Sequence, residues 1–253
     1  MVIDRSLIIA TDGDNISFSG RIRLSGEDEL SMFPSLFTLN VWNLPEEAAL
    51  RISRCRNISV SHGDACLVSG TVSDVYRRAA PEGILTTVSI SLGLELWESV
   101  ISLAVAAGKT VSESIALILN ASGTGIPLLT YSWDDPVLSR GHSYLGRASE
   151  CIESVTSAMR GRAMLTPSGV MVVPSGGLPE HYRIDKKDLI DIPSFVDSGR
   201  IMILYATVAG WRPGQTVLVS YDDIQVRGII RNRSVNADTS AGPWSTEMIV
   251  EVL

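Results

Sequence analysis

The sequence predicts a mainly β protein with an α+β insertion, in which two antiparallel β-barrel domains flank a small α+β domain. The last fifty residues read as four strands separated by short turns, and the first 97 read as six strands and one short helix. From Trp97 the spacing of the apolar residues changes from that of a strand to that of a helix. We therefore place the first barrel at residues 1–98, the α+β domain at 99–178 and the second barrel at 179–253, free to close with strands from elsewhere in the chain.

The N-terminal segment alternates strand-like runs with turn residues. Pro45 stands where a first helical turn accepts proline, and the acidic pair Glu46–Glu47 favours a helix start, so a short helix is expected to end near Arg51 or Ile52. Because a sheet of this length leaves exposed edges unless it closes, we expect a barrel. The predicted strands are Ser6–Thr11, Ile16–Leu24, Leu36–Leu44, Asn57–Ser61, Cys66–Tyr76 and Leu85–Leu96.

The middle segment combines helical and strand-like patterns. Thr110 followed by Glu113 fits a capping box, and Gly123 is typical of a helix end. Pro167–Gly169 predicts a hairpin, and Ser175–Pro179 reads as a linker. The predicted helices are Ser99–Ala107, Val111–Leu119 and Tyr144–Met159, and the predicted strands are Ile126–Leu129, Ala163–Thr166 and Val170–Val173.

The C-terminal segment has the period of two that is typical of half-buried strands. Ile224 and Val226 alternate with Gln225 and Arg227, and Gly210–Gly214 supplies a tight reversal. Its predicted strands are Ile201–Val208, Gln215–Ser220, Ile224–Val235 and Trp244–Val252.

Composition excludes several classes of protein. The net charge of −7 argues against a nucleic-acid binder that grips phosphates, and no stretch approaches the length of a membrane span. The N-terminus lacks the pattern of a signal peptide. The three cysteines, Cys55, Cys66 and Cys151, indicate neither a disulfide framework nor a zinc site, so we expect reduced thiols in a product made in the cytoplasm.

The residues that could carry catalysis do not form a recognisable constellation. The adjacent carboxylates Asp134–Asp135 and Asp222–Asp223 lie in turn-like contexts, where solvated turn carboxylates are expected. No serine stands in the glycine-flanked elbow of a hydrolase. The histidines have no second ligand at metal-binding spacing, so we predict no enzyme, no cofactor and no metal; they are His62, His142 and His181.

Several motifs in order resemble the baseplate hub proteins of contractile phage tails, a family related to the N-terminal part of the type VI secretion spike. The resemblance spans nearly the whole chain. It covers a strand and short helix at Phe37–Ile52, a strand at Leu67–Tyr76, the element order of Val100–Val173, and the closing segments Asp188–Val196, Trp211–Val217 and Arg233–Met248.

This resemblance implies a homotrimeric ring of pseudo-sixfold symmetry in the virion baseplate. The ring would join the tail tube protein to the central spike protein, with the tape-measure protein as a further partner, around a channel that we expect to be acidic. No sequence-specific nucleic acid and no membrane is expected as a partner. Trp211, Trp244 and Trp42 are our candidates for interface anchors. The alternatives are a hexameric tail-tube or distal-tail adaptor, a tail-associated cell-wall hydrolase and a carbohydrate-binding module.

Overall fold

The computed structural model describes residues 5–12, 14–16, 18, 20–129, 134–174 and 181–253. They form two compact units, one of residues 1–28, 35–92 and 181–253, the other of residues 29–34 and 93–180. The protein is mainly β, as predicted. Both terminal β segments belong to the first unit, which we divide into an N-terminal half (up to residue 92) and a C-terminal half (from residue 181). The finer division into three domains stays a prediction.

The N-terminal half is an antiparallel sheet with the strand order β3-β4-β7-β6-β5-β1-β2. Alternation in β4 turns Phe37, Leu39 and Val41 into the core. The predicted strand Ile16–Leu24 is wrong in its bounds, because the chain forms two strands there. The elements are β1 (Ile8–Thr11), β2 (Asp14–Ile16), β3 (Ile22–Glu29), β4 (Ser35–Trp42), α1 (Glu46–Arg54), β5 (Asn57–His62), β6 (Ala65–Ala80) and β7 (Gly83–Leu92).

The C-terminal half contains the four predicted strands and two more that the sequence did not reveal. β13 pairs in parallel with β16, and β14 lies at the end of the strand order beside β15. The elements are β13 (His181–Asp185), η1 (Lys186–Asp188), β14 (Ser194–Val196), η2 (Asp197–Gly199), β15 (Ile201–Ala206), β16 (Thr216–Tyr221), β17 (Ile224–Asp238) and β18 (Trp244–Val252).

The two halves share one 13-stranded sheet because β17 pairs with β3. β17 also pairs with β16 through its first residues and with β18 along most of its length. Over the described residues the pairing follows an open path, so closure into two barrels stays a prediction. The core of the N-terminal half also takes in Val235, Ala237 and Trp244 from the C-terminal half. Burial of these side chains stabilises the contact between the halves.

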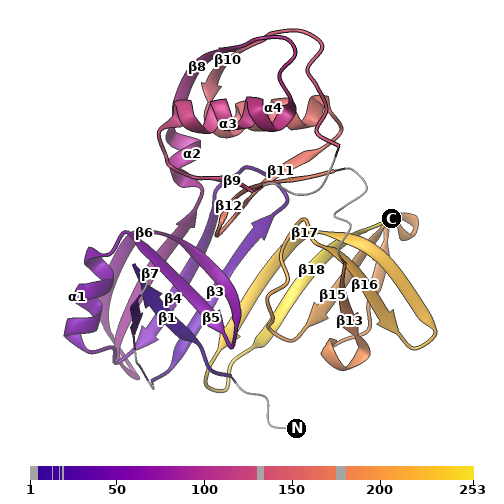
Figure 1. The fold of residues 1–253 in the computed structure, drawn as a ribbon. Helices are drawn as coiled ribbons and strands as arrows, with labels where there is room; N and C mark the ends of the chain where they lie inside the picture. The colour runs from indigo at the N-terminus through magenta and orange to yellow at the C-terminus, as the bar shows by residue number, and fades with distance from the viewer. Residues whose placement is uncertain (1–4, 13, 17, 19, 130–133, 175–180) are drawn as a thin grey trace. The chain divides into compact units, whose positions relative to one another are not determined.

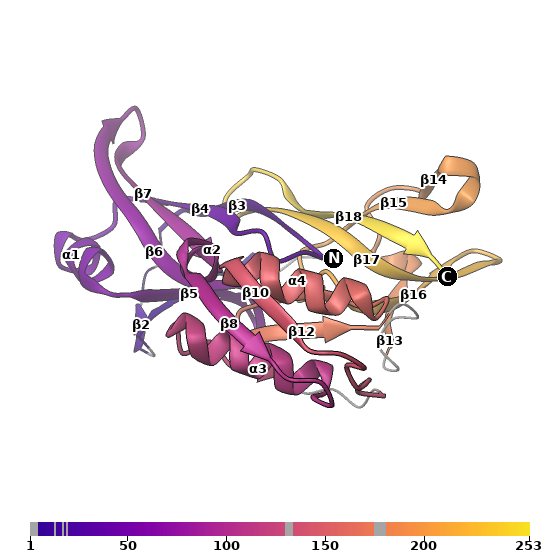
Figure 2. The same ribbon diagram turned by 90° about the horizontal axis from the view of Figure 1, so that it is seen from above.

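The second unit places two helices between two small sheets (Figure 1). Helix α3 contacts β8 and β9, while α4 contacts β10 and β11. Seen from above, the β8–β10 ribbon crosses both helices (Figure 2). The elements are α2 (Leu94–Glu98), β8 (Val100–Val105), α3 (Val111–Ser122), β9 (Leu128–Leu129), β10 (His142–Arg147), α4 (Ala148–Ala158), β11 (Arg162–Thr166) and β12 (Gly169–Val173).

Local signals in this unit were predicted well, and non-local ones were not. The capping box of Thr110 and Glu113 is confirmed, and so is the left-handed end of α3 at Gly123 (φ 68°). The predicted helix Ser99–Ala107 is wrong, because that segment is β8, which pairs with β10. The predicted helix Tyr144–Met159 starts too early for the same reason, since Tyr144 lies in β10. The predicted linker Ser175–Pro179 lies outside the described residues.

Candidate functional site

The junction between the two β halves is built around a buried ion pair. Arg233 on β17 is 2% exposed, and its Nε and Nη2 donate to the two carboxylate oxygens of Asp28 on β3, at 2.8 Å and 2.6 Å. The same guanidinium donates to the carbonyl oxygens of Trp211 (2.8 Å) and Leu67 (3.0 Å). One side chain thus binds four oxygens from three separate segments, which the planar fork of arginine permits and lysine does not.

A second, half-exposed pair reinforces the junction nearer the end of β17. Arg21 donates through Nε (3.2 Å) and Nη2 (2.8 Å) to the carboxylate of Asp238, and through Nη1 (2.6 Å) to Glu82. The hydrogen bond to Asp238 raises the pKa of Arg21. Burial alone would raise the pKa of Asp238, but hydrogen bonds from Arg21 and from the Ser240 backbone N–H outweigh burial and lower it. Both groups are therefore charged at neutral pH.

Backbone hydrogen bonds complete the junction. The N–H of Thr239 donates to the carbonyl of Ile22 (2.9 Å), and the N–H of Ile22 donates to the Thr239 hydroxyl (2.9 Å). Arg5 donates to the carbonyls of Ser240 and Gly242, both at 3.0 Å. The turn between β17 and β18 is thus bonded to two segments of the N-terminal half, Arg5 and Ile22, which fixes one half against the other.

The three tryptophans proposed as interface anchors occupy different environments. Trp211 is 9% exposed in the C-terminal core, and Trp244 is 5% exposed in the N-terminal core. Rings buried in the chain's own cores have little surface left for a partner, which weighs against an anchoring role for these two. Trp42 is partly exposed, with the Arg21 guanidinium 4.4 Å from its ring centroid. An interface role for Trp42 stays a prediction.

Four of the other residues singled out from the sequence, Asp135, Asp222, His62 and His142, have structural partners. Asp135 accepts hydrogen bonds from the backbone N–H (3.0 Å) and hydroxyl of Ser112 at the start of α3. Burial alone would raise the pKa of Asp135, but these bonds lower it. Asp222 pairs with Lys186 at 2.6 Å. His62 Nδ1 lies 2.9 Å from the Ser6 carbonyl, and the ring of His142 stacks on Tyr144.

Metal and membrane sites find no support in the part of the chain that the structure describes. Within residues 5–12, 14–16, 18, 20–129, 134–174 and 181–253, no group of three or more His, Cys, Asp or Glu could hold a metal ion. In the same residues no helix is long and apolar enough to cross a membrane. Burial raises the pKa of the thiols of Cys55 and Cys151, which keeps them protonated and poorly nucleophilic at neutral pH.

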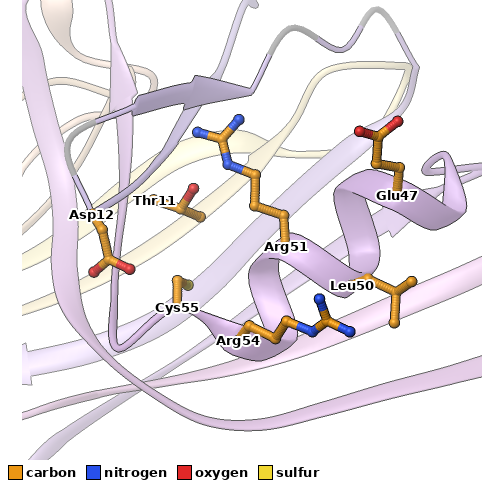
Figure 3. A pocket seen from close by; sticks show the side chains of 7 residues that line it. All are labelled: Thr11, Asp12, Glu47, Leu50, Arg51, Arg54 and Cys55. Carbon is orange, nitrogen blue, oxygen red and sulfur yellow. The ribbon is translucent and has the colours of Figure 1, made fainter.

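A shallow hollow of about 460 Å³ lies beside α1 (Figure 3). Its lining includes Leu50, Arg51 and Arg54 from the helix, and Thr11 from β1. Thr11 is 2% exposed, and its hydroxyl has no hydrogen-bond partner among the described residues. Arg51 points to the side of β1 and β2, whereas Arg54 runs along the helix (Figure 3). The remaining lining residues are Asp12, Glu47 and Cys55.

Comparison with solved structures identifies the fold. A tail protein from Neisseria meningitidis MC58 superposes with a TM-score of 0.70 and 12% identity, over 97% of this chain and 95% of that one. The 43 kDa tail protein of prophage MuSo2 from Shewanella oneidensis gives 0.67 and 11%, over 97% of each chain. The chain has the fold of phage tail proteins.

A type VI secretion protein shares this fold. The E. coli c3393 protein, a type VI secretion component described as similar to the T4 tail proteins gp27 and gp5, gives a TM-score of 0.65 and 11% identity over 97% of this chain and 76% of its own. No protein-family model and no curated protein matches the sequence. The resemblance noted in the sequence is therefore confirmed by the structural neighbours, which are phage tail and secretion proteins, and it is confirmed at the level of the fold.

Proposed function

We propose that this chain is a structural baseplate hub of a phage tail. In this role three copies form a ring of pseudo-sixfold symmetry that joins the tail tube to the central spike and surrounds the channel. The observation that carries the proposal is the superposition of nearly the whole chain on nearly the whole of two tail proteins. A match of that extent leaves little of either chain outside the shared fold.

The junction supplies what such a ring needs from each copy. Three chains imitate sixfold symmetry when each contributes two similar β bodies, which we propose to be barrel-like, at a fixed separation. Arg233 and Asp28 fix the two β halves through a buried, bidentate contact. The shared strand β17 makes the same connection through the backbone. A first unit built in this way keeps its two β halves in a constant arrangement, so both halves meet the tube in a constant register.

Strand edges are the proposed contacts to neighbouring proteins. β14 ends the strand order on one side. β6 pairs with β5 up to Thr71, so over the described residues its stretch Ser73–Ala80 is bonded to β7 on one side alone. Free edges accept strands of another chain through backbone hydrogen bonds, with side chains giving specificity. We further propose an acidic lumen, which would keep a translocating duplex from binding, and a role without catalysis.

Native mass spectrometry and cryo-EM of the purified chain, alone and mixed with the tail tube protein of the same tail, test this function. We expect a trimer whose class averages show threefold symmetry with six similar β bodies. A hexamer would favour the adaptor instead, and cell-wall hydrolysis that a single carboxylate change abolishes would favour an enzyme. A chain that stays monomeric in both samples would contradict the hub.

A further inference from the structure

An exposed, acidic and apolar segment connects β13 to β15. Residues Asp188–Asp197 read D-L-I-D-I-P-S-F-V-D, with three aspartates and no basic residue. Ile192 is 65% exposed, and Ile190, Phe195 and Val196 are also among the large exposed hydrophobic side chains. Single exposed apolar residues are ordinary, but four within seven residues form a patch of the kind that marks an interaction surface.

This segment is held in place. The N–H of Ile190 donates to the carbonyl of Tyr205 (2.8 Å), and the N–H of Thr207 donates to the carbonyl of Asp188 (2.8 Å). β14 pairs with β15 further along. The turn that follows has Asp197 and Ser198 at φ 49° and 54°, in the left-handed region where residues with a side chain are uncommon. The chain thus presents these apolar side chains in a defined conformation.

The hollow beside α1 has the complementary chemistry. The end of α1 and the two residues after it read R-I-S-R-C-R, so Arg51, Arg54 and Arg56 make this end of the helix basic. Leu50 gives the hollow an exposed apolar side chain, and the Thr11 hydroxyl is a buried donor that has no partner within the described part of the chain. The carboxylate of Asp12 on the same side accepts a hydrogen bond from the Asn57 N–H (3.1 Å).

We propose that the segment Asp188–Asp197 of one copy docks in the α1 hollow of a second copy of this chain. The carboxylate of Asp191 meets the guanidinium groups of Arg51 and Arg54, and Ile190 and Ile192 pack on Leu50. Because the two surfaces differ, the contact is head-to-tail, and such a contact forms a ring when the rotation between successive copies closes. This inference rests on the proposed ring and names the surfaces that build it.

Charge reversal with rescue tests the contact. We expect Arg54→Glu and Asp191→Arg each to raise the protein concentration at which the oligomer half dissociates by about tenfold or more, since like charges are then brought together. The double variant Arg54→Glu/Asp191→Arg restores an opposite-charge pair with the signs exchanged. Its half-dissociation concentration should return to within about threefold of the wild-type value. The matched controls Arg140→Glu and Asp223→Arg change exposed residues outside both surfaces and should leave the oligomer unchanged. Analytical ultracentrifugation over a concentration series gives the readout.

Cross-linking reports the same contact without weakening it. Leu50 lines the hollow and its side chain is 47% exposed, so in a Cys55→Ser background a short bis-maleimide should join the thiol introduced by Leu50→Cys to the thiol introduced by Ile192→Cys in the next copy. We expect a ladder of covalent multimers that disappears when either introduced cysteine is left out. A ladder that persists without the thiol of Leu50→Cys would overturn the docking.

The results separate this inference from the function on which it rests. If the wild-type chain forms a trimer that neither reversal weakens, the docking is wrong and the hub proposal stands. If the wild-type chain forms no oligomer in either sample of the functional test, both fail. If the single variants dissociate and the double variant does not recover, the charge pairing is overturned.

Discussion

Removing the Arg233 side chain should destabilise the first unit more than any single change of an exposed charge. Arg233→Met leaves the Asp28 carboxylate buried without its partner and removes the donors to two carbonyl oxygens. Breaking a buried ion pair by deleting one partner costs about 3–5 kcal/mol. Each buried carbonyl left unbonded adds about 1–3 kcal/mol if water cannot reach it. We expect a loss of at least about 4 kcal/mol, near the total stability of many domains.

The size of the effect is best measured as a double-mutant cycle. Asp28→Leu alone leaves the Arg233 guanidinium buried without its counterion. The double variant Asp28→Leu/Arg233→Met removes both charges, and only the carbonyls of Trp211 and Leu67 then lose their hydrogen bonds. We therefore expect the double variant to be more stable than either single variant, with a coupling energy of about 2 kcal/mol or more. Urea unfolding followed by tryptophan fluorescence suits this test, because Trp211 and Trp244 lie in the two cores that the junction connects.

An exposed arginine provides the control for this cycle. Arg183 on β13 is mostly exposed, with a loose contact of 3.7 Å to Asp185. Arg183→Met should change the free energy of unfolding by less than about 1 kcal/mol. If the changes in unfolding free energy of Asp28→Leu and Arg233→Met sum to that of the double variant within about 0.5 kcal/mol, the two side chains act independently. The reasoning about a coupled buried pair would then be refuted.

Three further predictions concern other parts of the chain. Thr110→Ala removes the cap of α3 and should cost about 1 kcal/mol by thermal unfolding. The pKa of Asp238 is lowered in the folded state, so its contribution to stability is complete above the unfolded-state pKa of about 3.9 and is lost as the pH falls below that value. Asp238→Asn should therefore reduce the loss of unfolding free energy with falling pH in the acidic range. An unchanged pH dependence would contradict this. Gly70→Ala would bring a Cβ within 2.4 Å of the Ser91 carbonyl oxygen and should cost about 1–3 kcal/mol, while Gly161→Ala, with no atom closer than 3.5 Å, should be nearly neutral.

Elements specified by local chemistry were predictable from the sequence. The cap at Thr110, the left-handed Gly123 and the Pro167–Gly169 hairpin depend on residues within a few positions of one another. The strands of the C-terminal half also appeared, because alternation along β17 and β18 reflects a sheet with one buried face.

Elements that depend on distant partners were not predictable. β8 has alanine and leucine at positions that fit a helix, and its strand conformation is set by pairing with β10, which begins some forty residues later. β13 is a short strand whose parallel partner β16 lies beyond two other strands and two 3-10 helices. The junction itself escaped prediction, because Arg233 and Asp28 are 205 residues apart and nothing in either local sequence indicates a buried charge.

The pairing of β17 with β3 also constrains the order in which the protein can mature. β3 leaves the ribosome long before β17 has been synthesised. The early chain therefore has a β3 edge without the backbone hydrogen bonds of β17 and an Asp28 carboxylate without Arg233. Closing a loop of that length is entropically slow, although its equilibrium penalty grows only with the logarithm of length. Nascent chains that stop before β17 should consequently aggregate or bind chaperones, and the chain should become fully soluble only after β17 has been synthesised.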